Sequence, residues 1–358
     1  MGSVCCKTSK VESVSLHNFQ NNSTEGRTEV SELNSSGTLS SSPQRIFWKR
    51  GECIGSGSNF NVYQCLNINT GEILAVKTFR LRRETSSKFS EMIKREIKLM
   101  GGICHPNILT CCQTEVHENR IEVLYEYIPA GSLKELSVEF GIFDERIIRN
   151  YTKQILRGLC YLHRNSIFHN NINPKTILVT ETGQIKLTNF GMSTKAQDQV
   201  DLKQLLQKDP YWSAPEVLNE QTKTLDSSLK HCADIWSLGC VLVELLSGKN
   251  VWFPLKPFEV LRTLCSSQKV PRIPECSPSL LNFIELCLQR EPSTRPSADK
   301  LSKHVFITGR NYSYDFQLSE TMSDSLKDSL NSSRGLNSKK PGSLQGIIQE
   351  ISSIESEN

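Results

Sequence analysis

The sequence has little net charge, no internal repeat and no apolar run long enough to cross a membrane. Each absence excludes a class of fold or function. The 42 Lys and Arg stand against 38 Asp and Glu, a formal charge of +4, so bulk electrostatics exclude a basic nucleic-acid-binding protein. The longest apolar stretch, residues 235–246, is interrupted by Ser237, Gly239 and Glu244. It falls well short of the roughly 20 residues that a membrane helix needs. We therefore expect a soluble, non-repetitive chain.

The 13 cysteines form no C-x-x-C pair and do not cluster with the histidines, so a structural zinc site has little support. Their number is odd, and the first residues lack the charged start and apolar core of a secretory signal. Both features favour a reducing compartment over a disulfide framework. We expect a cytoplasmic protein.

Two serine-rich segments flank a region of ordinary globular composition. Residues 1–44 contain 11 serines and residues 311–358 contain 12, with few large apolar side chains to offset the entropy that is lost on ordering. We predict a disordered N-terminal tail at residues 1–44, one folded domain at residues 45–308 and a disordered C-terminal tail at residues 309–358.

The front of the domain has strand patterns and the rest has helical ones. Residues 61–66 and 73–79 alternate in polarity around Asn69-Thr-Gly71, which predicts a hairpin. Apolar residues recur at helical spacing over residues 88–100, before Gly101-Gly102, and again over residues 144–164 and 234–247. The patterns predict an α+β fold with a small strand-rich lobe followed by a larger helical lobe.

A glycine-containing segment and an isolated lysine suggest a binding site. Ile54-Gly-Ser-Gly-Ser-Asn-Phe-Asn-Val62 lies at the start of the hairpin, although glycines there could serve only the turn. Lys77 stands in mid-strand where an apolar residue would pack, and Glu96 follows on the predicted helix. Because a buried cation needs an anion, we expect these two to pair, either around a nucleotide or as a structural ion pair alone.

Six further motifs follow in order: His105-Pro-Asn-Ile108, His169-Asn-Asn-Ile-Asn-Pro-Lys-Thr-Ile-Leu178, Asn189-Phe-Gly191, Tyr211-Trp-Ser-Ala-Pro-Glu216, Asp234-Ile-Trp-Ser-Leu-Gly239 and Arg295-Pro296. With the glycine segment and Lys77, they resemble the signature set of eukaryotic protein kinases over residues 47–307. Trp48-Lys-Arg-Gly, the turn at 69–71, residues 127–132 and Pro210-Tyr-Trp resemble the MEKK-like branch, the mitogen-activated protein kinase kinase kinases. The resemblance implies a bilobal fold, with an N-lobe at residues 45–126 and a C-lobe at residues 127–308.

The positions that carry the chemistry of this family are altered. In the family's loop His-Arg-Asp-Ile-Lys-Pro-x-Asn, the Asp accepts the proton of the substrate hydroxyl, the Lys steadies the phosphate and the Asn holds magnesium. The matching residues are Asn171, Asn173 and Thr176, and the Asp of Asp-Phe-Gly is Asn189. An amide is a very poor base, and loss of general-base assistance typically removes about 10²–10⁴ in rate. The resemblance thus implies that no catalytic set is intact.

Three neighbouring positions change as well. Asp209 stands where the family has a Thr that bridges the catalytic Asp and Lys, and Asn170 replaces the Arg that receives a phosphate on the activation segment. Phe60 replaces the third glycine of the phosphate loop. We expect its bulk to crowd the backbone that would cradle phosphates.

The nucleotide pocket and the supports of the fold are retained. By resemblance, the nucleotide-binding positions are Ile54, Gly55, Gly57, Val62, Ala75, Lys77, Glu96 and Leu178. The supporting positions are Met100, His169 and Phe190 in the apolar stack between the lobes, Tyr125 at the gatekeeper, Glu216 with Arg295 in a salt bridge, and Asp234 as anchor of the catalytic loop.

The resemblance and these changes together imply a pseudokinase, catalytically inactive or very weak, that acts as a scaffold or allosteric regulator in a kinase signalling pathway. We expect ATP binding to be weak, Mg²⁺ binding to be doubtful, and partners to be other protein kinases or their substrates, with no nucleic acid. Two alternatives stay open. One is a residual Ser/Thr protein kinase, and the other is a nucleotide sensor in which ATP shifts lobe closure without being consumed.

The N-terminus reads Met1-Gly-Ser-Val-Cys-Cys-Lys, which makes Gly2 a candidate for myristoylation and Cys5 and Cys6 candidates for palmitoylation. Cys6 stands where the myristoylation pattern has Ser or Thr. Because one myristoyl chain anchors only marginally, stable attachment needs a second acyl group. We expect either a protein anchored on the cytoplasmic face of a membrane or an unmodified tail.

Overall fold

The computed structural model describes residues 45–57, 60–81, 93, 97, 99–117, 119–190, 193–195, 209–218 and 229–309. The chain divides into two compact units, residues 1–309 and residues 310–358, and the second lies outside the described residues. So do the predicted tail at residues 1–44, with Gly2, Cys5 and Cys6, and nearly all of the predicted tail at residues 309–358.

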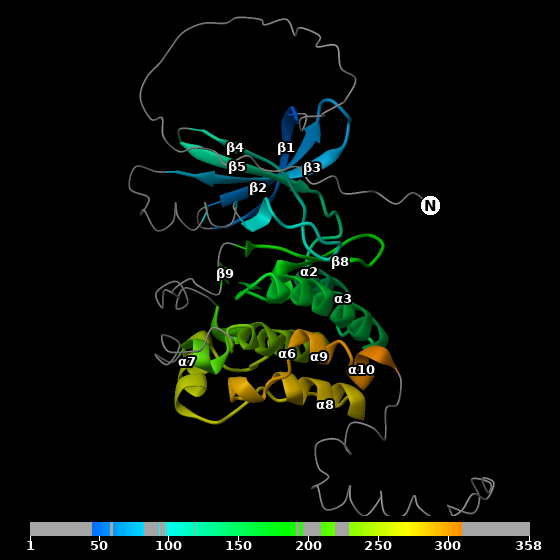
Figure 1. Cartoon of the computed structure of the whole chain (residues 1–358), viewed down its shortest axis with the longest axis vertical. Coiled ribbons are helices and arrows are strands. Elements are labelled where there is room, and N and C mark those ends of the chain that lie inside the picture. The colour runs from blue at the N-terminus through cyan, green and yellow to red at the C-terminus, as the bar shows by residue number, and fades with distance from the viewer. Residues whose placement is uncertain are drawn as a thin grey trace, which may run out of the picture. The chain divides into compact units, whose positions relative to one another are not determined.

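An antiparallel sheet of five strands forms the front of the domain (Figure 1). It contains β1 (Trp48–Ser56), β2 (Phe60–Asn67), β3 (Ile73–Arg80), β4 (Cys111–Val116) and β5 (Arg120–Glu126), in the order β1-β2-β3-β5-β4. The predicted hairpin is β2 with β3, where Phe60 pairs with Phe79 and Leu66 with Ile73. Its turn contains Gly71 at φ 76°, a conformation that glycine adopts without strain.

The two faces of the sheet pack into different cores. Cys65, Leu74, Val76 and Leu124 form a small cluster on one face, whereas alternate residues such as Phe79, Val123 and Tyr125 belong to the main core. The main core continues into the helical part of the chain. This second face therefore looks towards the helices.

The helix predicted between β3 and β4 is described in part. Ile93, Ile97, Leu99 and Met100 are helical, and the helix ends where Gly101 N donates to Ile97 O at 2.9 Å. The remaining residues of the predicted helix, Glu96 among them, lie outside the described residues.

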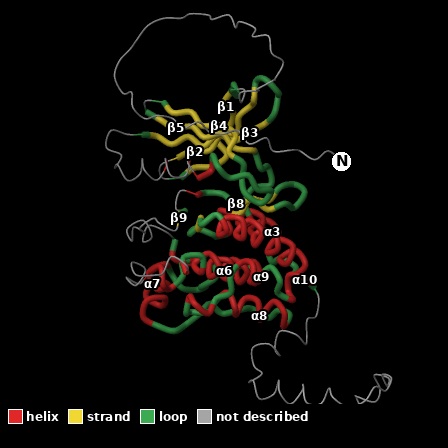
Figure 2. The backbone as a smooth tube through the Cα atoms, viewed as in Figure 1, coloured by secondary structure: helices red, strands yellow, loops and turns green. Residues whose placement is uncertain are grey.

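The C-terminal part is mostly helical, as predicted (Figure 2). Its helices are α2 (Leu133–Phe140), α3 (Glu145–Arg164), α5 (Pro215–Leu218), α6 (Cys232–Ser247), α7 (Pro257–Ser266), α8 (Pro278–Cys287), α9 (Ala298–Leu301) and α10 (Val305–Thr308). Asp144 caps α3 by accepting from Arg146 N at 2.8 Å. Residues 232–246 of α6 are all buried, so the longest apolar stretch is a core helix.

Short elements lie between the helices, and those that precede α5 form the site. They are β6 (Ile167–Phe168), η1 (Pro174–Thr176), β7 (Ile177–Val179), β8 (Ile185–Leu187), β9 (Thr194–Lys195), η3 (Pro210–Trp212) and η6 (Pro292–Thr294). β6 pairs with β9 and β7 pairs with β8. Sequence periodicity misses these strands because two or three residues are too few to show an alternation.

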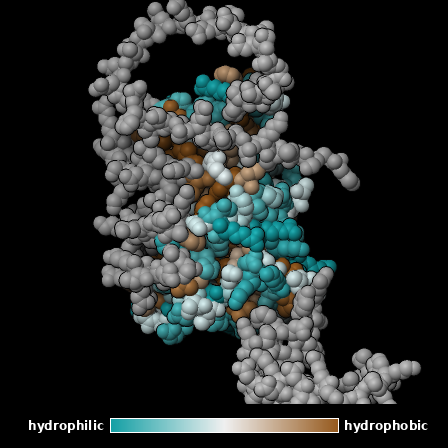
Figure 3. All heavy atoms as spheres, in the orientation of Figure 1, coloured by the Kyte–Doolittle hydropathy of each residue, from teal (hydrophilic) through white to brown (hydrophobic). Residues whose placement is uncertain are grey.

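The described helices include none that is both long and apolar enough to cross a membrane. Figure 3 shows hydrophilic side chains over the region of α3 in this view, with hydrophobic side chains gathered beside the sheet. Several apolar residues of the sheet, namely Ile54, Leu66, Ile73 and Val116, are indeed exposed, and so is Ile68 in the turn between β2 and β3.

Candidate nucleotide and catalytic site

Three side chains predicted to bind a nucleotide share one face of the sheet. Val62 on β2 pairs with Lys77 on β3, and Lys77 pairs with Val123 on β5. Because side chains alternate between faces along a strand, Val62, Ala75 and Lys77 point to the same side, towards the helical part. Ala75 and Lys77 are 9% and 8% exposed. This face forms the roof of the candidate site.

The segment between β1 and β2 brings Phe60 against a predicted phosphate-binding glycine. Gly55 pairs with Val62, and Gly57 N donates to Phe60 O at 2.8 Å. A Cβ added at Gly57 would lie 2.5 Å from the Phe60 ring, so only glycine allows the ring to take this position. Ile54, before these glycines, is 44% exposed.

Lys77 contacts two aromatic rings. Its Nζ lies 4.7 Å from the ring centroid of Phe60 and 4.8 Å from that of Phe79, distances at which an ammonium is attracted to the ring face. The two ring centroids are 6.0 Å apart. The predicted pairing of Lys77 with Glu96 stays a prediction, since Glu96 lies outside the described residues.

Leu178 and the segment after β5 form the other side of the predicted nucleotide pocket. Leu178 lies on β7, is partly buried, and makes an isolated bridge to Ser132. The Glu126 carboxylate at the end of β5 accepts from Thr110 N at 2.7 Å and from Lys186 Nζ at 2.8 Å. The segment is thus tied both to the loop before β4 and to β8. Tyr125, at the predicted gatekeeper position, is buried at 5% exposure.

A buried carboxylate anchors the loop that follows β6. Asp234 on α6 accepts from the backbone N of His169 at 2.9 Å and of Asn170 at 2.7 Å, and the His163 ring lies 2.9 Å away. Burial alone would raise the pKa of Asp234, but these hydrogen bonds and the nearby histidines lower it below its ordinary value. Asn170 takes φ 58°, so the backbone turns sharply at the anchor.

The three altered residues of this loop hydrogen-bond to one another. Asn173 Nδ2 donates to Asn171 O at 3.1 Å and to Asn171 Oδ1 at 3.2 Å. Thr176 Oγ1 donates to Asn171 O at 2.7 Å, and Asn173 Oδ1 accepts from Lys175 N at 2.9 Å. Asn173 and Thr176 are 8% and 4% exposed. The side-chain polar atoms of Asn173 and Thr176 are therefore used within the loop.

Asn189 lies in the segment that follows β8 and takes φ 69°. The next residue, Phe190, is fully buried and its ring centroid lies 4.9 Å from that of His169. His169 also hydrogen-bonds through Nε2 to Thr188 O at 3.0 Å. The predicted contact between His169 and Phe190 is thus present, and Phe190 and Met100 both belong to the main core. His169 itself packs and hydrogen-bonds, as expected of a structural histidine.

Residues 209–214 are held firmly against α6. Ser237 Oγ donates to Trp212 O at 2.7 Å, and Trp212 Nε1 donates to Glu244 Oε2 at 3.1 Å. Glu244 is 1% exposed and its other oxygen accepts from Lys134 Nζ at 2.8 Å. Asp209 caps η3 by accepting from Tyr211 N at a long 3.5 Å. Although Asp209 as a residue is exposed, desolvation raises the pKa of its carboxyl group.

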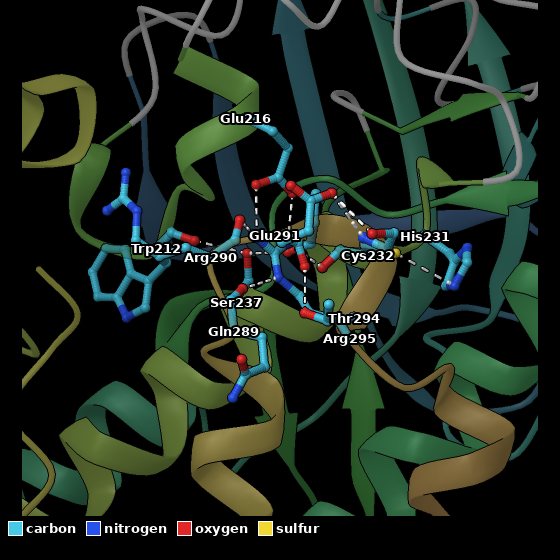
Figure 4. Close-up of polar contacts among 12 residues, drawn as sticks. Trp212, Glu216, His231, Cys232, Ser237, Gln289, Arg290, Glu291, Thr294 and Arg295 are labelled. Atoms are coloured by element: carbon cyan, nitrogen blue, oxygen red, sulfur yellow. Dashed lines mark hydrogen bonds and ion pairs between the residues drawn. The ribbon is translucent and has the colours of Figure 1, made fainter. Parts of the chain in front are cut away.

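The predicted salt bridge between Glu216 and Arg295 is buried and bidentate (Figure 4). Arg295 Nη1 and Nη2 donate to Glu216 Oε1 at 2.5 Å and Oε2 at 2.7 Å, and Nη1 also donates to Cys232 O at 2.9 Å. The guanidinium lies 5.1 Å from the Trp236 ring centroid. The pair thereby joins α5, α6 and the segment after η6.

The family model of the protein kinase domain matches residues 48–307. The chain belongs to the protein kinase family. The predicted bilobal kinase fold is confirmed, since the five-stranded sheet and the helical region have the arrangement that the family requires.

Similar proteins include mitogen-activated protein kinase kinase kinases, the branch that the sequence predicts. The chain is 37% identical over 263 residues to mitogen-activated protein kinase kinase kinase 3 of Arabidopsis thaliana, covering 73% of this chain and 42% of that protein. It is 39% identical over 272 residues to mitogen-activated protein kinase kinase kinase A of Dictyostelium discoideum, covering 74% and 28%. It is 34% identical over 298 residues to cytokinesis protein sepH of Aspergillus niger, covering 79% and 22%. The chain thus spans less than half of each relative.

The protein kinase family uses ATP, and the adenine end of the site suits it better than the phosphate end. Val62, Ala75 and Leu178 provide apolar surfaces at the positions that sandwich adenine in the family. At the phosphate end, the Phe60 ring lies against Gly57 and the ammonium of Lys77. The ring therefore occupies space beside Lys77 at the end of the site where the family places the triphosphate.

The residues at the family's magnesium positions do not fit a divalent cation. Thr176 and Asn189 bring no negative charge, whereas Mg²⁺ is usually bound through carboxylates and substrate phosphates. Within the described part of the chain, ligand-type atoms gather instead at Glu115, His117 and Glu122 on β4 and β5. There Arg50 and Arg120 already pair with Glu122, so that cluster is a network of ion pairs.

Sequence reasoning missed the role of Glu244. It was noted only as an interruption of the apolar stretch, yet it joins Lys134 on α2 to Trp212 on η3. A charged residue inside an otherwise apolar core helix was the available signal, because a buried carboxylate requires partners.

Proposed function

We propose that this protein is a catalytically silent member of the protein kinase family that regulates kinase signalling by binding other proteins. The observation that carries the proposal is the set of hydrogen bonds among Asn171, Asn173 and Thr176. In the family, the corresponding side chains act on the substrate hydroxyl, the phosphate and the metal. Here Asn173 Nδ2 and Thr176 Oγ1 donate to Asn171 within the loop.

Chemical reasoning supports the loss of phosphoryl transfer. A general base at position 171 would contribute about 10²–10⁴ in rate, and a carboxamide there cannot take up the proton of the acceptor. The absence of a carboxylate at position 189 removes the electrostatic clamp on the metal, which acts on the same transition state. The contributions to the rate of residues that act together are not additive. Restoring one of these residues therefore does not compensate for the absence of the others.

Support for a regulatory role comes from what the domain keeps. The anchor at Asp234, the stack of His169 and Phe190, and the bidentate pair of Glu216 with Arg295 are intact. These contacts maintain the folded surface of a kinase domain, although the groups that serve phosphoryl transfer are replaced. Since the named relatives are mitogen-activated protein kinase kinase kinases, we propose that the partners are kinases of such a cascade or their substrates.

A radiolabelled phosphotransfer assay tests catalytic silence. The full chain is incubated with γ-labelled ATP, a general protein substrate, and either Mg²⁺ or Mn²⁺, beside the Lys77→Met variant. We expect the wild type and Lys77→Met to label the substrate equally. Labelling by the wild type that disappears in Lys77→Met would establish the rival function, a residual Ser/Thr protein kinase.

Immunoprecipitation from the protein's own cells tests the partner. Kinase activity that co-purifies equally with the wild type and with Lys77→Met comes from a bound kinase, and we expect this result. Precipitates that contain neither kinase activity nor a kinase substrate would overturn the regulatory proposal while leaving catalytic silence intact.

We further propose a location on the cytoplasmic face of a membrane through acylation of Gly2 together with Cys5 or Cys6, all outside the described residues. The support is the motif itself and the marginal strength of a single myristoyl anchor, which makes a neighbouring thiol useful.

A further inference from the structure

A cavity lies between the altered catalytic loop and the segment that follows residue 208. Asn171 and Asn173 line it from the loop, Asp209, Trp212 and Val217 line it from the opposite segment, and Ser237 closes it from α6. Three of these positions differ from the family pattern in charge. The family's Asp, Lys and Thr are here Asn171, Asn173 and Asp209, so an anionic and a cationic group are lost and one carboxyl group is gained on the other wall.

Among the residues that line the cavity, Asp209 is the one with a charged side chain. Asn171 Oδ1 accepts from Asn173 Nδ2, and Asn173 Oδ1 accepts from Lys175 N, so both amide oxygens already have partners in the loop. Within the part of the chain that the structure describes, the Asp209 carboxylate accepts one hydrogen bond, from Tyr211 N at 3.5 Å, and this is long for such a bond. A ligand that donates hydrogen bonds would find its strongest acceptor at Asp209.

The surroundings of Asp209 stabilise its charged form poorly. Desolvation raises the pKa of the carboxyl group, and the Tyr211 N–H and the charge of the exposed Lys175 offset this only in part. A cation in the cavity would supply the missing stabilisation, because a charge-assisted hydrogen bond is roughly twice as strong as a neutral one.

The other walls suit a long basic side chain. Trp212 is buried at 7% exposure and its backbone is fixed by Ser237, so it forms a firm wall. Ala214, Val217 and Ala233 add apolar surface. The aliphatic stem of Lys or Arg packs on such surface while its head reaches an anion, and indole attracts cations as well.

We propose that this cavity binds a lysine or arginine side chain of a partner protein, with Asp209 receiving its charge. This inference rests on the proposed regulatory function, because it describes the kind of partner segment that the protein binds. The position that the family uses for a hydroxyl acceptor has become a site for a basic side chain, which the protein holds without modifying it.

The test uses the indole N–H signals of the ¹⁵N-labelled full chain, which has four tryptophans. The signal of Trp212 is assigned with Trp212→Phe, and Trp48 on β1 is the internal reference. The probes are N-acetyl-arginine methylamide and the uncharged, nearly isosteric N-acetyl-citrulline methylamide. We expect the arginine probe to shift the Trp212 signal saturably, with an affinity at least about tenfold above that of citrulline, since hydrogen bonds to charged groups are the stronger ones.

Variants separate recognition from structure. Asp209→Asn should reduce the arginine affinity to that of citrulline, Asp209→Glu should keep the preference, and Glu181→Gln, which removes an exposed carboxylate elsewhere, should change nothing. Equal shifts by both probes, no shift by either, or an unchanged preference in Asp209→Asn would show that Asp209 merely caps η3 and would overturn the inference. None of these results depends on the phosphotransfer assay, so each proposal fails separately.

Discussion

The ammonium group of Lys77 lies against the face of Phe60, with Nζ 4.7 Å from the ring centroid. In the family, the lysine at this position pairs with the phosphates of ATP. Here the residue that replaces the third glycine of the loop occupies the neighbourhood of that cation. One substitution in the loop therefore affects the phosphate end of the site twice, by filling space and by engaging the charge.

Removal of the ring should improve nucleotide binding. We expect Phe60→Ala to raise ATP affinity by about tenfold over the wild type, because a desolvated cation–π contact is worth about 1 to 2 kcal/mol. Thermal-shift titration with ATP measures this. Phe258→Ala, at an exposed position on α7, is the matched control and should behave as the wild type. Equal affinities in Phe60→Ala and the wild type would show that the ring does not obstruct the triphosphate.

Restoring two carboxylates should not restore phosphoryl transfer. We expect Asn171→Asp combined with Asn189→Asp to remain at least about 10² below a variant that also carries Asn173→Lys, Thr176→Asn and Asp209→Thr, because each missing group acts on the same transition state. Radiolabelled transfer with Mg²⁺ gives the rates, and Lys77→Met in each background gives the blank. Full recovery in the double variant would refute the roles assigned to positions 173, 176 and 209.

The buried pair of Glu216 and Arg295 should dominate the stability of the helical part. Arg295→Ala leaves the Glu216 carboxylate buried without its partner, and we expect the free energy of unfolding to fall by about 3–5 kcal/mol. The control is Arg164→Ala, which breaks a pair with Asp299 whose side chains are 71% and 47% exposed. That change should cost less than about 1 kcal/mol. Urea unfolding measures both, and comparable losses would contradict the expected effect of burial.

Acid should weaken the anchor of the catalytic loop. The folded state lowers the pKa of Asp234, so its contribution to stability is complete above the pKa of an unfolded Asp, about 3.9. It is lost as the pH falls from there through the lower, folded-state pKa. We expect Asp234→Asn to be less stable than the wild type at neutral pH, with a difference that narrows below about pH 4. A difference that stays constant with pH would show that the carboxylate charge is not what holds the loop.

The N-terminal motif makes a separate prediction. If Gly2 is myristoylated, Gly2→Ala should move the protein from the membrane fraction to the soluble fraction. Cys5→Ser combined with Cys6→Ser should do so in part, because one acyl chain anchors only marginally. Cys53→Ser, at an exposed cysteine of β1, is the control. If Gly2→Ala leaves the distribution of the protein between the membrane and soluble fractions unchanged, the proposed lipid anchor is refuted.

Much of the fold followed from local pattern. The hairpin of β2 and β3, the start of α3 at Asp144 and the core helix around Trp236 were all predicted, because alternation, capping residues and helical spacing are properties of neighbouring residues. The two short sheets, β6 with β9 and β7 with β8, were not predicted. Their pairing joins segments that are distant in sequence or too short to carry a period.

The sequence by itself determined which chemical groups the site lacks, because the identities of Asn171 and Asn189 are fixed whatever the chain does in space. Tertiary structure alone decided how the replacements are used. The approach of Phe60 to Lys77, the bonds among Asn171, Asn173 and Thr176, and the cavity that Asp209 shares with that loop depend on how packing positions separate segments. Such contacts have no one-dimensional signature, since a side chain's partner is set by the backbone that carries it.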